Sequence, residues 1–389
     1  MIGTQSSSRS LNILCATSVA AGEEAFSSLG NVTMMPESEI RAGALRDVDV
    51  LITRSKVKVN DELLRGSNLQ FYGTATAGSD HVDEAALAAR GITWSEAAGC
   101  NARSVAEYVI ASLAHLGRKR TISWRDRTLA IIGAGHVGSC LGVLAKALGL
   151  RVRYCDPPLA ERTGETRYES LDDVLADADL VSLHVPLTSS GTHATCGMVN
   201  RRFFDAMKPG AIFINSSRGE VVADESELIA RRADGRFGGL VLDVYHHEPA
   251  IMPELIEAAD LATPHIAGYS LDGRLMGTQM IYEAACRHFG REPRWRISAN
   301  EVPGRLKFAA NNEMPDDLLY STILAAYDPS SDHAGLKGAI EHPSDIPQNF
   351  SALRANYPNR RSFGHFAVDL KREPRLATLG FVDVEPLTS

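Results

Sequence analysis

Short apolar segments alternate with amphipathic stretches along the chain from residue 11 to about residue 290. The first apolar runs are 11–16, 48–53 and 71–74, and a stretch with helical periodicity follows each of them. Strands that alternate with helices are joined by crossover connections, so this order predicts parallel β-sheets covered by helices. The pattern therefore places the chain in the α/β class.

The alternation is interrupted once, by a long amphipathic pattern that begins at Asn101. Apolar residues recur there at intervals of about four, from Val105 to Leu116, and Asn101 is suited to cap such a helix. The alternation then restarts with an apolar run at 129–132 and continues to 239–244. We therefore expect two doubly wound parallel-sheet units of the Rossmann or flavodoxin type.

The last part of the chain has a different texture. Beyond about residue 292, proline and charged residues interrupt the pattern, which indicates a third, smaller α+β domain over 300–389. The total length of 389 residues agrees with two or three domains at roughly 150 residues each. A composition of 44% hydrophobic and 23% charged residues suits a soluble globular protein.

Charge and cysteine usage narrow the range of partners. Lys and Arg number 40 against 48 Asp and Glu, a net charge of -8, so the chain lacks the basic field that nucleic acid or an anionic membrane requires. The six cysteines are scattered, without a C-x-x-C pair or zinc-site spacing. We expect a cytoplasmic protein with reduced thiols, no metal, and a small-molecule partner rather than nucleic acid or membrane.

A glycine motif lies at the start of the second unit. It fits G-x-G-x-x-G, directly follows the apolar run 129–132 and opens a helix; its residues are Gly133, Ala134, Gly135, His136, Val137 and Gly138. Such a turn brings backbone N–H groups and a helix N-terminus to a pyrophosphate. Asp156, eighteen residues after Gly138, is placed to bind an adenosine ribose and to repel a 2'-phosphate, so NAD is favoured over NADP.

Three further residues each follow an apolar run of the second unit: Arg218, Glu248 and His265. Together they suit hydride transfer from a secondary alcohol. The guanidinium would hold a carboxylate, the imidazole would take the hydroxyl proton, and the carboxylate would orient the imidazole. Spacing alone leaves this trio open, because each residue also fits an ordinary surface loop.

The order of these motifs, including Ser217-Arg218-Gly219, His247-Glu248-Pro249 and Pro264 to Gly268, resembles the D-isomer-specific 2-hydroxyacid dehydrogenase family over residues 11 to about 290. The resemblance implies a substrate-binding domain from 11–100 and 266–292, with an NAD-binding Rossmann domain, 101–265, inserted between them. It also implies the roles of the trio: Arg218 binds the substrate carboxylate and carbonyl, His265 is the acid/base, and Glu248 is its partner.

A narrower resemblance is carried by residues 54–55, 58–60, 73–83, 99–102, 155–158 and 265–269. These segments are similar to a subgroup of that family that oxidises a 4-phosphorylated four-carbon hydroxy acid. The region 300–389 is similar to the C-terminal dimerisation domain of the same subgroup, which implies a homodimer formed through this domain.

The substrate of this subgroup has two anionic ends. Backbone N–H groups of the loop 76–79 could meet the carboxylate, and the basic stretch 54–58 could meet the phosphate, although it also fits a solvated loop. The resemblance implies substrate contacts by six residues: Arg54, Ser55, Thr76, Ala77, Gly78 and Tyr269. It implies NAD contacts by the glycine motif (Gly133, Gly135, His136, Val137, Gly138) and by Asp156, Val185, Ser216, Ser217, Arg218, Asp243 and Gly268.

Other functions stay open at this stage. 3-Phosphoglycerate dehydrogenase, or another D-2-hydroxyacid dehydrogenase, would use the same trio on a different acid. An NADH-sensing corepressor-like protein would share the fold but turn over poorly. Arg354, Arg360 and Arg361 form a further hypothesis, since this arginine cluster could reach the substrate of a partner subunit.

Overall fold

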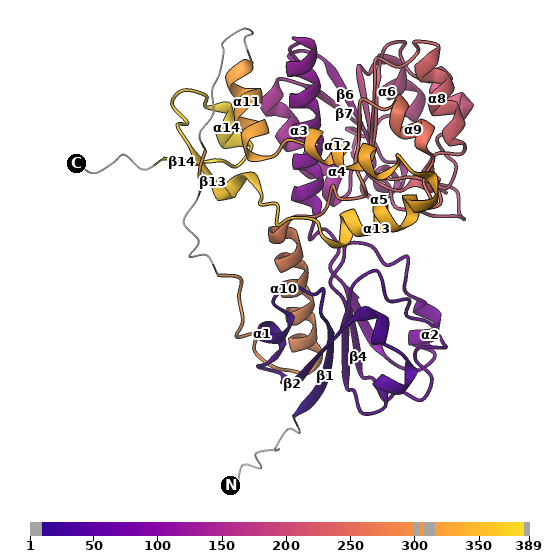
Figure 1. Cartoon of the computed structure of the whole chain (residues 1–389), viewed down its shortest axis with the longest axis vertical. Helices are drawn as coiled ribbons and strands as arrows, with labels where there is room; N and C mark the ends of the chain where they lie inside the picture. The colour runs from indigo at the N-terminus through magenta and orange to yellow at the C-terminus, as the bar shows by residue number, and fades with distance from the viewer. Residues whose placement is uncertain (1–9, 299–303, 307–315, 385–389) are drawn as a thin grey trace, which may run out of the picture. The chain divides into compact units, whose positions relative to one another are not determined.

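The computed structural model describes residues 10–298, 304–306 and 316–384 (Figure 1). The chain divides into two compact units, one of residues 1–101 with 271–300 and one of residues 102–270 with 301–389. The expected C-terminal domain, 300–389, lies partly outside the described residues, and its described part belongs to the second compact unit.

The first unit contains a five-stranded parallel sheet in the order β2-β1-β3-β4-β5. Its strands are β1 (Leu11–Ala16), β2 (Gly30–Met35), β3 (Val50–Thr53), β4 (Phe71–Thr74) and β5 (Thr93–Glu96), and its α-helices are α1 (Gly22–Phe26), α2 (Glu84–Ala88) and α10 (Leu271–His288). The three expected strands are confirmed. The two edge strands, β2 and β5, are half exposed, which is why they carry no apolar run that sequence patterning could detect.

The second unit contains a six-stranded parallel sheet in the order β11-β10-β9-β8-β6-β7. Its strands are β6 (Thr128–Ile132), β7 (Arg151–Cys155), β8 (Leu180–Leu183), β9 (Ile212–Asn215), β10 (Gly239–Leu242) and β11 (Leu261–Ala262). Its α-helices up to residue 270 are α3 (Ala102–Arg120), α4 (His136–Ala145), α5 (Pro157–Thr163), α6 (Leu171–Asp177), α7 (Arg201–Ala206), α8 (Glu225–Ala233) and α9 (Pro253–Ala258).

The described C-terminal residues add helices and a small sheet to the second unit. The helices are α11 (Asp317–Ala326), α12 (Ser330–Ala339), α13 (Ile346–Ala355) and α14 (Arg375–Thr378), and the sheet orders β12 (Gly304–Arg305), β13 (Phe366–Val368) and β14 (Val382–Asp383). In Figure 1, α11 lies beside α3, and α14 packs against the short turn 146–148 that follows α4. Leu319, Tyr320 and Ile323 of α11 share a buried apolar cluster with α3, so this segment completes the core around that helix.

The expected α/β class with two parallel-sheet units is confirmed, and the described residues also form a small third sheet. Every residue is buried in six strands of the two large sheets, as is expected of parallel sheets covered on both faces. These strands are β3, β4, β6, β8, β9 and β10. No helix within the described ranges combines the length and apolar character needed to cross a membrane.

Candidate active site

Three neighbouring strands of the second unit end at the same edge of the sheet. β9 is followed by the loop that carries Arg218, β10 by Asp243, and β11 by the segment that carries His265. Parallel strands present their carboxyl ends on one side, which is where such sheets bind ligands. The topology therefore gathers residues that are up to 47 positions apart, counting from 218 to 265, along one edge.

Glu248 and His265 are in contact. His265 Nδ1 lies 2.7 Å from Glu248 Oε2, and the backbone N–H of Tyr245 donates to Glu248 Oε1 at 3.0 Å. Burial alone would raise the pKa of Glu248, but the charge of His265 and their hydrogen bond, followed by the charge of Arg354, hold that pKa below its usual value. Glu248 is therefore an ionised carboxylate directed at the imidazole.

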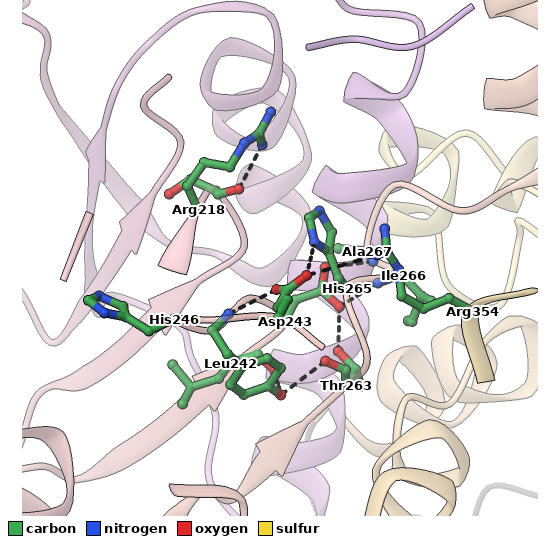
Figure 2. A network of polar contacts seen from close by, with 12 residues as sticks. Arg218, Leu242, Asp243, His246, Thr263, His265, Ile266, Ala267 and Arg354 are labelled. Atoms are coloured by element: carbon green, nitrogen blue, oxygen red, sulfur yellow. Dashed lines mark hydrogen bonds and ion pairs between the residues drawn. The ribbon is translucent and has the colours of Figure 1, made fainter. Parts of the chain in front are cut away.

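Asp243 holds the backbone that follows His265. Its Oδ1 accepts from Thr263 Oγ1 and from the N–H of Ile266, both at 2.7 Å, and its Oδ2 accepts from the N–H of Ala267 at 2.8 Å (Figure 2). Burial raises the pKa of Asp243 to about 6, against the lowering effect of these bonds and of the His265 charge. His265 itself has a φ of 55°, an uncommon backbone conformation for a residue with a side chain. The bonds from Asp243 keep this turn, and hence the imidazole, in one place.

Arg218 begins a short 3-10 turn at the end of β9. Its Nη1 donates to the carbonyl oxygen of Ser217 at 2.8 Å, and Asn215 Nδ2 donates to the carbonyl oxygen of Arg218 at 3.0 Å. The next residue must be glycine, because a Cβ at Gly219 would lie 2.1 Å from the carbonyl carbon of Tyr245. This close approach brings the Arg218 loop against the loop that carries Glu248.

The glycine motif has the geometry that a dinucleotide needs. Gly133 has a φ of +92°, and a Cβ there would lie 2.5 Å from the carbonyl oxygen of His184. In contrast, nothing lies within 4 Å of a Cβ built on Gly135, the residue that caps α4 without any side-chain cap bond. Gly135 directly precedes the first turn of α4, whose backbone N–H groups, including those of His136 and Val137, have no partner within the helix and are suited to a phosphate.

Other expected cofactor residues lie at this turn or after neighbouring strands of the same sheet. Asp156 accepts from the N–H of Ala134 at 2.8 Å and from the N–H of Leu159 at 3.0 Å, so the carboxylate is fixed beside the glycine turn. Ser216 Oγ is buried and has no hydrogen-bond partner within the described residues, which leaves it available to a ligand. Half-buried Val185 follows β8, and half-buried Gly268 follows the Asp243-bound turn. These residues fit NAD.

The expected substrate residues of the first unit follow two neighbouring strands. Half-buried Arg54 and exposed Ser55 follow β3, and the half-buried loop of Thr76, Ala77 and Gly78 follows β4. Thr76 Oγ1 donates to the carbonyl oxygen of Gly78 at 3.1 Å, which closes the loop on itself. The structure therefore brings these five residues to one sheet edge, whereas Tyr269 belongs to the second unit.

Sequence reasoning missed the role of His81. Its Nε2 lies 3.0 Å from Thr74 Oγ1, which in turn lies 2.7 Å from Thr76 Oγ1. The Tyr72 hydroxyl lies 3.4 Å from the same imidazole nitrogen. His81 thus supports the Thr76 loop through Thr74. The stretch 73–83 was singled out in the sequence, but only the fold shows that the His81 side chain contacts Thr74 and Tyr72 of β4.

A Rossmann-type NAD domain and a carboxylate–imidazole pair at the strand ends define the class of this protein: an NAD-dependent dehydrogenase that acts on an alcohol carbon. The chain belongs to the D-isomer specific 2-hydroxyacid dehydrogenase family. The model of the NAD binding domain of this family matches residues 103–267.

Curated relatives match nearly the whole chain. An erythronate-4-phosphate dehydrogenase of Salinibacter ruber is 41% identical over 371 residues, which cover 92% of this chain and 94% of the relative. One of Escherichia coli O1:K1 is 37% identical and covers 95% of this chain and 98% of the relative. Among solved structures, D-lactate dehydrogenase from Aquifex aeolicus, complexed with NAD and lactic acid, has a TM-score of 0.57 at 25% identity, covering 72% of this chain and 96% of that one.

Proposed function

We propose that the protein oxidises 4-phospho-D-erythronate at C2 to (R)-3-hydroxy-2-oxo-4-phosphooxybutanoate with NAD, a step in pyridoxal 5'-phosphate biosynthesis. The observation that carries the reaction type is the 2.7 Å contact between Glu248 and His265. The named activity of relatives that match 92% and 95% of this chain supports the choice of substrate.

His265 is the general base of the proposed reaction. Since its Nδ1 faces the Glu248 carboxylate, that nitrogen carries the hydrogen, and Nε2 is the nitrogen that can accept a proton. In the oxidation the C2 hydroxyl proton goes to Nε2, and Glu248 stabilises the imidazolium that forms. Bound NAD supplies the acceptor for the hydride that leaves C2. In the reverse direction His265 returns its proton to the carbonyl oxygen.

Charged and polar groups recognise the two anionic ends of the substrate in this proposal. Arg218 binds the carboxylate and polarises the reacting oxygen, because a guanidinium can donate two parallel hydrogen bonds. The backbone of Thr76 to Gly78 also meets the carboxylate, Arg54 and Ser55 meet the phosphate, and Tyr269 contacts substrate. The bonds that close the Thr76 loop support a preformed binding surface.

The test is a comparison of substrates by NADH absorbance. Purified protein and NAD are mixed with 4-phospho-D-erythronate, unphosphorylated erythronate or 3-phosphoglycerate, and each reaction is also run from the oxo acid. We expect a preference for the phosphorylated four-carbon acid. A preference for 3-phosphoglycerate would keep the mechanism and replace the substrate. NAD binding without turnover of any acid would favour the corepressor-like function.

We also propose that the protein is a cytoplasmic homodimer that pairs through its C-terminal segment. The narrower resemblance over 300–389 supports this assembly, and the six scattered cysteines, which form no disulfide, support a reducing compartment.

A further inference from the structure

Arg354 enters the active-site network from the C-terminal segment, outside the residues that the NAD binding domain model matches (Figure 2). It lies on α13. Its Nη2 donates to the hydroxyl of Tyr269 at 3.2 Å, and its Nη1 lies 3.9 Å from Glu248 Oε2, the oxygen that bonds to His265. One guanidinium therefore touches both the expected substrate residue and the partner of the base.

The guanidinium is held by packing as well as by polar contacts. Its central carbon lies 5.6 Å from the centre of the Tyr269 ring and 6.0 Å from that of Phe350. Cations over aromatic faces are attracted to the ring quadrupole. The Nε atom is buried without a hydrogen-bond partner among the described residues, so the side chain is not simply a solvated surface arginine.

We propose that Arg354 is a positioning residue for the reaction, which fixes the Tyr269 hydroxyl and the Glu248 carboxylate through one guanidinium. This inference rests on the proposed function. It assigns a role in the active site to α13, a part of the chain that the NAD binding domain model does not match. It also differs from the idea of an arginine that serves a partner subunit, since the contacts of Arg354 lie within its own chain.

The cation also affects proton uptake by the Glu248–His265 pair. Other ionisable groups face the pair from neighbouring elements: Glu225 at the start of α8, Asp243 after β10, and His246 and His247 in the following loop. Arg354 adds a positive charge beside Glu248, and this charge disfavours the binding of a further proton by the Glu248–His265 pair. Removing this charge lets the pair keep its proton to higher pH.

The experiment compares two variants. Arg354→Met removes both the positive charge and the planar, fork-shaped set of guanidinium N–H donors, whereas Arg354→Lys keeps the charge and loses only this fork. In Arg354→Met we expect kcat to fall about tenfold, and the acidic limb of the oxidation rate profile to move up by on the order of one pH unit. In Arg354→Lys we expect kcat to fall while the acidic limb stays in place. Arg372→Met, at an exposed arginine of the same segment, is the matched control and should match wild type.

A second measurement needs neither substrate nor cofactor. The side-chain carboxyl carbon signal of Glu248, assigned with a Glu248→Gln variant, is followed against pH by NMR in wild type, Arg354→Met and Arg354→Lys, because the charge of Arg354 lowers the pKa of this carboxyl group. We expect the titration midpoint of Glu248 to move upward in Arg354→Met and to stay near the wild-type value in Arg354→Lys. If wild type fails to oxidise the phosphorylated acid, the proposed substrate is wrong, and this titration still tests Arg354.

Several outcomes would overturn the inference. A folded Arg354→Met with wild-type kcat and an unmoved midpoint would make Arg354 a packing residue only, even if its melting temperature falls. A midpoint that moves equally in the Lys and Met variants would show that charge is not responsible. If Arg354→Met does not fold, Arg354→Lys decides alone, because wild-type kcat in that variant contradicts positioning by the fork.

Discussion

Single side chains in this site act in pairs, each of which brings together distant parts of the chain. Glu248 and His265 are 17 residues apart and meet at 2.7 Å, while Asp243 reaches 23 residues forward to the N–H of Ile266. If His265 is the general base, as we propose, it depends on these supporting residues, since a general base must be held within hydrogen-bond reach of its proton.

The first prediction concerns the base. His265→Ala should lower kcat by about 10² to 10⁴, the usual contribution of a positioned acid/base. The Asp243 bonds go to backbone N–H groups of Ile266 and Ala267 and survive the change, so NAD affinity should stay near wild type. Steady-state kinetics with a parallel NAD binding titration measures both, and turnover like wild type would remove His265 from the mechanism.

The second prediction follows from the lowered pKa of Glu248. A carboxyl group with a lower pKa in the folded state stabilises the fold above its unfolded pKa of about 4.3, and this stabilisation is lost as the pH falls through the folded value. The free energy of unfolding of wild type should therefore fall more steeply below about pH 4 than that of Glu248→Gln. Denaturant unfolding at several pH values measures the two slopes; parallel slopes would mean that the Glu248–His265 contact does not form in solution.

At the scale of elements, two glycines in the turn from β6 into α4 are expected to serve different purposes: Gly133 is needed for folding, and Gly135 is needed for binding NAD. Gly133 needs its positive φ and the space beside His184, whereas a Cβ on Gly135 would meet nothing within 4 Å. The same substitution at two positions two residues apart should therefore have different consequences, because only the second position has open space beside it, where we propose that the NAD pyrophosphate lies.

Gly133→Ala should lower the melting temperature, because its Cβ would lie 2.5 Å from a carbonyl oxygen. Gly135→Ala should leave the melting temperature unchanged and weaken NAD binding, since the methyl group occupies the space where a pyrophosphate approaches. Thermal denaturation and calorimetric NAD titration test the pair. Unchanged NAD affinity in Gly135→Ala would contradict the placement of the cofactor at this turn.

At the scale of the whole molecule, the C-terminal segment is part of the core of the second unit. The Tyr320 hydroxyl accepts from the N–H of Trp124 at 3.2 Å, and Arg360 donates to the carbonyl oxygens of Ser104 and Ala267 from a buried position. Arg360 thus connects α3 to the turn that follows His265. Through such contacts the C-terminal segment can affect the position of His265, although it lies outside the residues that the NAD binding domain model matches.

The proposed assembly gives the last prediction. Light scattering should report a particle of twice the chain mass of 42.0 kDa, because we propose that two chains pair through their C-terminal segments. A chain cut before residue 316 loses α11 to α14 and should expose the apolar face of α3, so we expect it to aggregate. A full-length particle of single-chain mass at micromolar concentration would rule out the homodimer.

The sequence alone was sufficient for whatever depends on local pattern. Apolar runs located the buried strands, and glycine spacing located the turn from β6 into α4, because periodicity and backbone permissiveness act over a few residues. Half-exposed β2 and β5 left no such signal. Only the tertiary structure decided that Glu248 faces His265, that His81 supports the Thr76 loop and that Arg354 reaches Tyr269 from 85 positions away. Those contacts arise from the packing of distant segments, and no short stretch of sequence encodes which distant side chains will meet.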